Sequence, residues 1–183
     1  VPATTPEQRR REANLWFFLV GICQSTRTLQ GTIDGVWRRG WDYLVAAARR
    51  ALAAGPDAFT AAQLSTIAPD ALRALFSDTG LPADSTLDRI DERVAQCQDM
   101  AAVLEGNYAG DVMGLYEAAG RRLRGPGGIL ARLAECDAYS DPVEKKSFLL
   151  VMFCVRCGAW QITDLDALKV AIDYHIMRIA LRS

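Results

Sequence analysis

The spacing of apolar residues constrains the fold of this chain more than any other feature. Apolar side chains recur at intervals of three and four residues along almost the whole sequence, Ala, Leu and Arg dominate, and no strand-like alternation persists. A chain of 183 residues with 50% hydrophobic composition can bury one core without disulfides or metal ions. The sequence therefore predicts an all-α, compact multi-helix protein. Residues 1–183 would form one helical domain, which could contain two small lobes with a cleft between them.

Capping signals predict where the helices begin and end. Thr5-Pro6-Glu7-Gln8 is typical of a helix start, and we expect that helix to run to about Arg27. A glycine-bearing loop should follow over residues 28–34, before a second helix that ends at Gly55-Pro56. Shorter helices are expected over residues 60–67, 70–76, 85–105 and 111–123, with another short one before Cys136.

A second strong start signal lies at Asp141-Pro142-Val143-Glu144. The helix that begins there should end near Gly158 and should carry Lys146 within its first turn and a half. A short helical turn is expected over residues 164–168, and Asp173 should open the last helix.

The charge pattern limits how the chain could bind nucleic acid. A net charge of −1 argues against a protein that coats nucleic acid indiscriminately, because such binding needs a local excess of cations. Arginines nevertheless cluster along the chain, so one basic face could form; the alternative is that each cluster lies on a solvated helix face. The clusters are Arg9–Arg11, Arg38–Arg39, Arg49–Arg50, and Arg121 and Arg122 with Arg124.

Several protein classes are disfavoured by composition. The richest apolar run, Phe148–Val155, is far too short to span a bilayer, and no secretory signal is recognisable near the N-terminus. The five cysteines are odd in number and suit a reducing compartment better than a disulfide framework. Cys154 and Cys157 have metal-ligand spacing, but a zinc site needs a second pair and the chain has one histidine. We therefore expect a cytoplasmic protein with no membrane association, no metal and no cofactor.

A carboxylate near the C-terminus and an upstream lysine together suggest chemistry on a glycosidic carbon. The carboxylate of Asp173 could stabilise the positive sugar carbon that forms as a base departs, and a neutral Lys146 amine could attack that carbon. Each residue also has a simpler explanation. Asp173 could serve only as a helix cap, and Lys146 could be a surface lysine, with Lys145 an equally plausible amine.

The same two residues carry a family resemblance. Ile172-Asp173-Tyr174-His175-Ile176-Met177-Arg178 places an apolar residue before the aspartate and an arginine five residues after it. Lys146-Ser147-Phe148-Leu149-Leu150 begins 27 residues upstream of the aspartate. This pattern resembles the helix-hairpin-helix superfamily of base-removing glycosylases, and the lysine is similar to that of the archaeal 8-oxoguanine DNA glycosylases. The resemblance implies a DNA-glycosylase-like fold with Asp173 and Lys146 as catalytic residues.

Other segments divide the resemblance between two branches of the superfamily. Gly40-Trp41-Asp42-Tyr43-Leu44 is similar to an aromatic segment of both branches, which implies that Trp41 stacks on the base. The second branch is the queuosine-salvage N-glycosylases. Three segments of this chain resemble that branch, namely Asn14 to Phe18, Leu87 to Arg93 and Tyr139 to Asp141. The glycine-rich hairpin that usually precedes the aspartate is missing. Both branches continue into further helices, so either this sequence is a piece of a longer protein or its pocket is completed differently.

The remaining candidate contacts follow from the resemblance and from spacing. Trp37 and Trp41 are four residues apart and would share a helix face, which equally describes two core aromatics. His175 is more typical of a structural role or a phosphate contact than of a general base. The predicted substrate-binding residues are Trp41, Trp37, Phe18, Asn14, His175 and Tyr139, and the predicted DNA contacts are Arg121, Arg122, Arg124 and Arg178.

Three functions remain open at this point. The chain could be a DNA N-glycosylase that removes a modified base and leaves an abasic site, with strand-cleaving activity through Lys146. It could instead be a queuosine-5′-phosphate N-glycosylase, or a helical binding module without catalysis. We favour the first, because a hydrolase of free nucleotides has no need of an amine nucleophile. Its partner would be DNA with a modified base, either in repair of a damaged purine or in defence against phage with hypermodified DNA.

Overall fold

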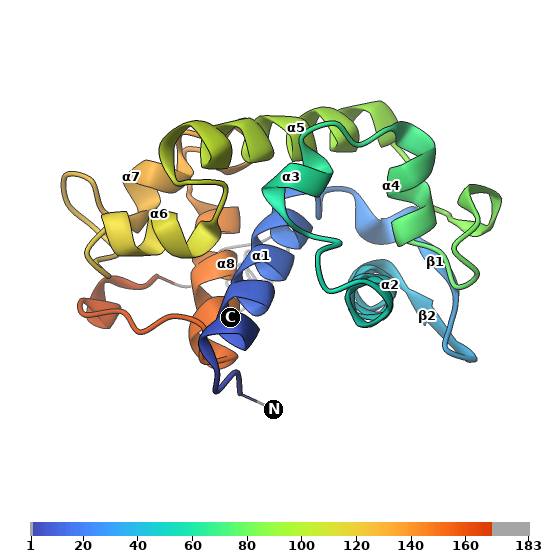
Figure 1. The fold of residues 1–183 in the computed structure, drawn as a ribbon, viewed down its shortest axis with the longest axis horizontal. Coiled ribbons are helices and arrows are strands. Elements are labelled where there is room, and N and C mark those ends of the chain that lie inside the picture. The colour runs from blue at the N-terminus through green and yellow to red at the C-terminus, as the bar shows by residue number, and fades with distance from the viewer. Residues whose placement is uncertain (1, 170–183) are drawn as a thin grey trace, which may run out of the picture.

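The computed structural model describes residues 2–169, and within that range the protein is mostly helical (Figure 1). The expectation of a predominantly α-helical fold is therefore confirmed, although one small sheet is also present. The helices are α1 (Pro6–Gly21), α2 (Gly40–Ala54), α3 (Ala61–Leu64), α4 (Pro69–Leu75), α5 (Ile90–Asn107), α6 (Val112–Ala118), α7 (Ile129–Leu133) and α8 (Lys145–Arg156). The strands are β1 (Gln30–Ile33) and β2 (Val36–Arg39).

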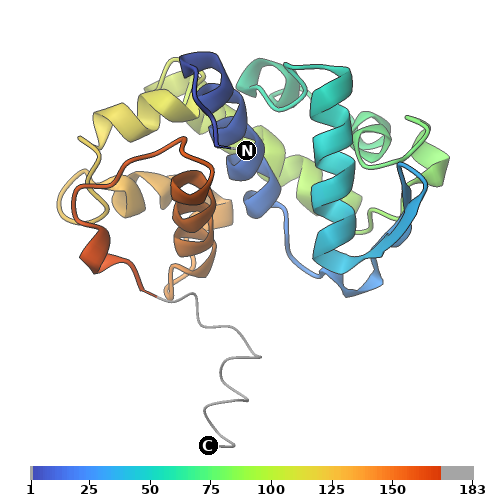
Figure 2. The ribbon, with the colours of Figure 1, turned by 90° about the horizontal axis from the view of Figure 1, so that it is seen from below.

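Helix α1 lies at the centre of the molecule. It begins as predicted, because the Thr5 side chain accepts from the Gln8 amide while the Gln8 side chain accepts from the Thr5 amide. Every residue from 13 to 21 is buried, and the helix packs on α2, α5, α6 and α8. Viewed from below, α8 lies on one side of α1 and α2 on the other (Figure 2). The buried apolar side chains of both sides belong to one cluster.

The segment after α1 differs most from the sequence prediction. We expected a helix to about Arg27, a loop, and a second helix from about residue 35. The structure instead ends α1 at Gly21, forms an antiparallel hairpin from β1 and β2, and begins α2 only at Gly40. Asp34 and Gly35 form the turn, both with positive φ, and an Asp-Gly pair between β-branched residues is a strong hairpin signal. That signal was present in the sequence, but the helical pattern on both sides of it led to the prediction of a loop and a helix instead.

Two other helix starts fall later than their capping signals predicted. Helix α5 begins at Ile90 rather than at Ser85, after Arg89 in a left-handed conformation. Helix α8 begins at Lys145, after Glu144 in a left-handed conformation, while Asp141 accepts the Val143 amide just before the helix. In both cases a turn stands between the capping signal and the helix, so Lys146 is the second residue of α8. No helix among residues 2–169 is both long and apolar enough to cross a membrane.

Candidate active site

Lys146 extends from the first turn of α8 toward the end of α1. Its Nζ atom donates to the Gly21 carbonyl oxygen at 2.5 Å, which is one of the carbonyls that the end of α1 leaves without a helical partner. Lys146 is partly buried, whereas the adjacent Lys145 is exposed. The structure therefore separates two lysines that the sequence left equivalent, and only Lys146 lies against the body of the protein.

Burial makes the Lys146 amine less basic than that of an exposed lysine. Partial burial lowers the pKa of Lys146 below its ordinary value, because desolvation penalises the charged form. The carboxylates of Asp141 and Glu92 lie near enough to oppose that change, and Arg93 adds to it. Burial also raises the pKa of the neighbouring Cys23 thiol, while the positive charge of Lys146 acts in the opposite direction. An amine with a lowered pKa next to carboxylates can act as a nucleophile.

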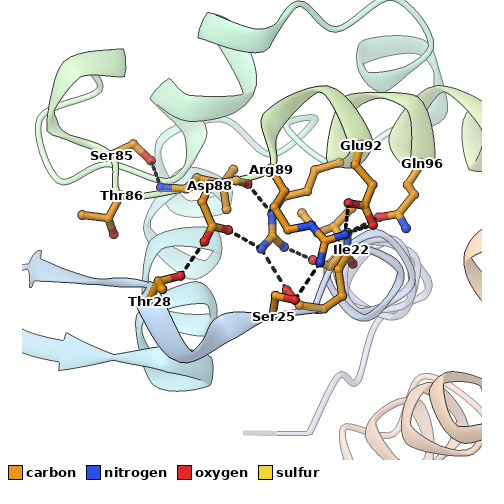
Figure 3. Close-up of polar contacts among 12 residues, drawn as sticks. Ile22, Ser25, Thr28, Ser85, Thr86, Asp88, Arg89, Glu92 and Gln96 are labelled. Atoms are coloured by element: carbon orange, nitrogen blue, oxygen red, sulfur yellow. Dashed lines mark hydrogen bonds and ion pairs between the residues drawn. The ribbon is translucent and has the colours of Figure 1, made fainter.

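A buried arginine holds the chain that follows Gly21. Arg93 of α5 has a fully buried side chain that donates to the backbone carbonyls of Ile22, Gln24 and Asp88 and to the Asp88 carboxylate. Figure 3 shows this network between α5 and the segment after α1. The Asp88 carboxylate also accepts from the Thr28 hydroxyl at 2.5 Å. The bonds to Ile22 and Gln24 hold the backbone directly after Gly21, whose carbonyl accepts from Lys146.

The outer side of this network is made of amides and an ion pair. Gln24 donates to Gln96 at 2.7 Å and to Glu92 at 3.4 Å, while its own side-chain oxygen is buried and has no hydrogen-bond partner. Arg89 pairs with Glu92 at 2.6 Å and donates to Ser25 at 2.9 Å. Figure 3 shows Arg89, Glu92 and Gln96 reaching from α5 toward this loop.

Trp41 joins an aromatic cluster on the same face of α8 as Lys146. Its ring lies 5.6 Å from Phe153 and 6.3 Å from Trp16, and Trp16 stacks on Phe153 at 4.2 Å between centroids. Phe153 follows Lys146 by seven residues, which is two helical turns or about 10 Å along α8. Lys146 and Phe153 therefore share one face of α8, with two helical turns between them.

Charged side chains hold this cluster and border a groove. Glu12 accepts from the Trp16 ring nitrogen at 3.1 Å and from Arg49, whose guanidinium lies 5.1 Å from the Trp16 ring centroid. A groove of about 320 Å³ is lined by both of these residues together with Trp16, Phe153 and Arg156. Aromatic faces beside guanidinium groups can bind a planar, negatively charged ligand.

Trp37 does not share a helix face with Trp41, so that prediction was wrong. Trp37 lies on strand β2, in the hairpin, and is 58% exposed. The spacing of four residues has no meaning across the junction between a strand and a helix, because side chains alternate with a period of two along β2. Trp37 therefore lies apart from the cluster that contains Trp41.

The other predicted substrate contacts are placed in the core or in a different groove. Phe18 and Tyr139 are core residues, and the Tyr139 hydroxyl donates to the Phe17 carbonyl at 2.5 Å. Complete burial raises the pKa of Tyr139 well above its ordinary value. Asn14 accepts the Val112 amide at 3.3 Å and borders a groove of about 460 Å³ beside the N-terminal half of α1. Among residues 2–169, no hydrogen bond joins any of these three side chains to Lys146 or Trp41.

Arg121, Arg122 and Arg124 lie in the segment after α6, where carboxylates of the protein already pair with some of the nearby donors. Arg124 pairs with Glu144 at 2.8 Å, and the Arg121 guanidinium lies 5.9 Å from the Tyr116 ring centroid. The Leu123 and Arg124 amides are taken by the Asp164 carboxylate, and these bonds lower the pKa of Asp164. An internal carboxylate thus occupies the amides that could otherwise have met a phosphate. Arg122 is exposed.

Three predicted residues, Asp173, His175 and Arg178, lie outside the described residues. Among those that are described, no three His, Cys, Asp or Glu side chains are grouped to hold a metal ion. Cys154 is buried and Cys157 half-buried.

Three residues of this site were not among the predicted site residues. Arg93 was noted only as part of the Leu87 to Arg93 segment, and the fold shows that its side chain is fully buried. Gln24 falls within the segment that was expected to be helical. Gly21 lies so close to α5 that a Cβ atom there would approach the Met100 sulfur to 2.3 Å. A glycine within a long apolar helix pattern is the one signal that could have pointed to such close packing.

Comparison with known proteins adds no information about the function of this site. No protein-family model matches the chain, and no curated protein matches it.

Proposed function

We propose that the protein is a DNA N-glycosylase that removes a modified nucleobase and leaves an abasic site, with Lys146 as an amine nucleophile. The single observation that carries the proposal is the position of that amine. It is partly buried, its pKa is lowered, and it lies on the same helix face as an aromatic cluster that contains Trp41. A reactive amine beside a surface that can stack on a base is the pair of groups that this reaction needs.

The proposed reaction breaks the bond between the base and the sugar carbon C1′. The electron pair of that bond leaves with the base, which takes up a proton, and the neutral Lys146 amine donates its lone pair to C1′. Loss of the amine proton and opening of the sugar ring give a Schiff base, and elimination of the 3′-phosphate then cleaves the strand. A carboxylate beside C1′ would stabilise the positive charge that develops there, and we assign that role to Asp173.

The amine also distinguishes this function from release of a base from a free nucleotide. Hydrolysis of a mononucleotide uses water as the nucleophile and has no strand to cleave, so a partly buried lysine with a lowered pKa would have no role as a nucleophile in it. The exposed Lys145, in contrast, has the ordinary position of a surface lysine at a helix start.

The direct test is to incubate the protein with duplexes that carry different modified bases, and separately with queuosine 5′-phosphate, and to detect the freed base. We expect release from at least one duplex, loss of release in Asp173→Asn, and loss of strand cleavage in Lys146→Ala. Lys145→Ala is the matched control and should retain both activities. Release from the mononucleotide alone would reject the proposal in favour of nucleotide salvage, and release from no substrate would favour a binding module.

A further inference from the structure

A groove follows the N-terminal half of α1, away from the end of this helix that Lys146 contacts. Its volume is about 460 Å³, and it is bordered by α1, by the connection from α2 to α3, and by the end of α5. Asn14, which lines the groove, precedes Gly21 by seven residues, or about 10 Å along the helix. The groove is therefore a separate feature from the Lys146 site.

Asn14 supplies a buried hydrogen-bond donor to the wall of this groove. Its side chain is only 5% exposed, and its Oδ1 atom accepts the Val112 amide at 3.3 Å. That bond determines which end of the side-chain amide is the oxygen, so the other end is the Nδ2 donor. Nδ2 forms no hydrogen bond with residues 2–169. Because a buried donor without a partner costs free energy, its place beside a groove points to a ligand that carries an acceptor.

Two carboxylates that line the same groove are unpaired in the described part of the chain. They belong to Asp57, in the connection from α2 to α3, and to Glu105, near the end of α5. Both residues are exposed, and neither carboxylate forms an ion pair or accepts a hydrogen bond from residues 2–169. The groove thus offers two acidic acceptors in addition to the Asn14 donor.

The other charged side chains around the groove neutralise one another. Glu7 pairs with Arg11 within α1, and Arg10 pairs with Asp111 at 2.6 Å. Among residues 2–169, no lysine and no other arginine borders the groove. Four carboxylates beside two guanidinium groups leave two negative charges in excess. A surface with this balance attracts cations and repels phosphates and carboxylates.

The groove also has an apolar wall and a fixed position for one of its carboxylates. Phe59, which is 3% exposed and packs edge-on against Phe76, lines it together with Leu52. The Asp57 carbonyl accepts from the Thr60 hydroxyl at 2.9 Å and from the Thr60 amide at 3.1 Å. These bonds hold the loop that presents the Asp57 carboxylate, so little conformational entropy is lost when a ligand binds there.

We infer that this groove binds a small organic cation that also carries hydroxyl groups, which is the chemistry of an amino sugar or amino alcohol. An ammonium group has three donors and can bond to the carboxylates of Asp57 and Glu105. A hydroxyl group can accept from Asn14 and donate to a carboxylate at the same time, whereas a carbonyl group has no donor for the carboxylates. The volume is in the usual range for a small-molecule site. This binding goes beyond the proposed function and does not depend on it.

Titration calorimetry with glucosamine, at a pH where its amine is protonated, tests the choice of ligand. Glucose has the same ring without the ammonium group, and glucuronate carries a carboxylate instead. We expect glucosamine to bind at least about tenfold more tightly than glucose, because an ion-paired hydrogen bond is stronger than a neutral one, and glucuronate not to bind.

Substitutions of the two unpaired acids test the position of the ammonium group. Asp57→Asn and Glu105→Gln should each weaken glucosamine binding about tenfold. Glu117→Gln is the matched control, since Glu117 is an exposed acid that borders a different groove, and it should leave the affinity unchanged. Thermal midpoints equal to that of the unchanged protein would exclude unfolding.

Nuclear magnetic resonance tests the role of Asn14 without changing a buried residue. The chain has two asparagines, Asn14 and Asn107, and the Asn107 side chain donates to Glu135 outside the groove. Loss of one pair of signals in Asn107→Asp assigns the two side-chain amides. Glucosamine should shift the Asn14 amide signals and leave those of Asn107 in place.

Four results would overturn the inference. They are no binding of glucosamine, equal or tighter binding of glucose or glucuronate, equal affinities in Asp57→Asn, Glu105→Gln and Glu117→Gln, and Asn14 signals that do not move when glucosamine binds. Base release from DNA is measured separately and requires none of these side chains. Failure of the proposed function would therefore leave glucosamine binding intact, and failure of glucosamine binding would leave base release intact.

Discussion

Two neighbouring regions of this molecule use arginine in opposite ways. Around the end of α1, Arg93 is fully buried and donates to three backbone carbonyls and a carboxylate. In the hairpin and the turn before it, Arg27, Arg38 and Arg39 form no ion pair and no side-chain hydrogen bond with residues 2–169, although Arg39 lies 5.7 Å from the Trp37 ring centroid. The first arrangement holds the backbone that follows Gly21, whose carbonyl accepts from Lys146, whereas the second adds no ion pair to the described part of the fold. Hydrogen bonding, rather than the number of arginines, therefore distinguishes the two regions.

The aromatic residues of the two regions show the same contrast. Trp41 is packed against Phe153 and Trp16, and charged residues hold that cluster in place. Trp37 is exposed among residues 2–169, and the Arg39 guanidinium of its own strand lies 5.7 Å from its ring centroid. The first tryptophan is therefore fixed by its packing, whereas the second is largely uncovered by the described residues.

Removal of the buried arginine should have the largest effect. Arg93→Met leaves three carbonyls and the Asp88 carboxylate without their donor, so we expect the free energy of unfolding to fall by about 3–5 kcal/mol. The thermal midpoint should fall on the order of 10 °C. Urea denaturation would measure the change. Arg89→Met removes a half-exposed arginine just before the same helix, one that pairs with Glu92 at the surface, and should cost less than about 1 kcal/mol. Equal losses in the two variants would contradict the distinction drawn between buried and exposed arginines.

Gly21→Ala should have a smaller effect that is still specific to the Lys146 site. The added Cβ atom would overlap the sulfur and terminal methyl of Met100, so the flexible end of that buried side chain must move within the core. We expect a loss of about 1–3 kcal/mol in the free energy of unfolding, together with slower strand cleavage, because the acceptor of Lys146 is displaced. Gly55→Ala is the control, since a Cβ atom there meets nothing within 4 Å. If Gly21→Ala destabilised the protein but left the rate of strand cleavage unchanged, Gly21 would contribute to packing and not to the position of Lys146.

The pH dependence of strand cleavage should follow the Lys146 amine. Only the neutral amine attacks C1′, so the rate should rise about tenfold per pH unit below the pKa of Lys146 and level off above it. Because burial lowers that pKa, the plateau should begin below the ordinary lysine value of 10.5. The unfolded lysine binds its proton more tightly than the folded one, so stability should also rise with pH across the same interval. A rate that still rises beyond 10.5 would show that burial does not activate this amine.

Trp37→Ala should have the smallest effect on stability. The side chain is 58% exposed, and its removal leaves no buried polar group without a partner. We expect the free energy of unfolding to change by less than about 0.5 kcal/mol, as measured by urea denaturation. A loss as large as that of Gly21→Ala would mean that Trp37 stabilises the hairpin despite its exposure.

The helices were predictable from the sequence because each has its own apolar period and local end signals. The capping box at Thr5 predicted the first residue of α1 correctly. The end of α1 was not predictable in the same way, because it depends on Arg93, which is distant in sequence and withdraws Ile22 and Gln24 from the helix. The hairpin had a local signal, Asp34-Gly35, which the helical pattern on both sides obscured.

The site was predictable in its residue types but not in its arrangement. Nothing in the sequence separates Lys145 from Lys146, because their burial is decided by α1, which packs against α8 from the other end of the chain. The pairing of Trp37 with Trp41 failed because two residues four apart share a face only within one helix. The neighbours of Trp41, which are Trp16 and Phe153, lie far from it in sequence.

Covalent trapping at an abasic site is the most direct measurement of whether Lys146 is the nucleophile. A Schiff base between an amine and C1′ becomes a stable secondary amine when borohydride reduces it, and the chain has only three lysines, at positions 145, 146 and 169. We expect an abasic-site duplex to give an adduct whose modified peptide carries the sugar on Lys146. The adduct should be lost in Lys146→Ala and retained in Lys145→Ala. An adduct on another amine, an undiminished yield in Lys146→Ala, or no adduct at all would contradict the assignment of Lys146 as the nucleophile.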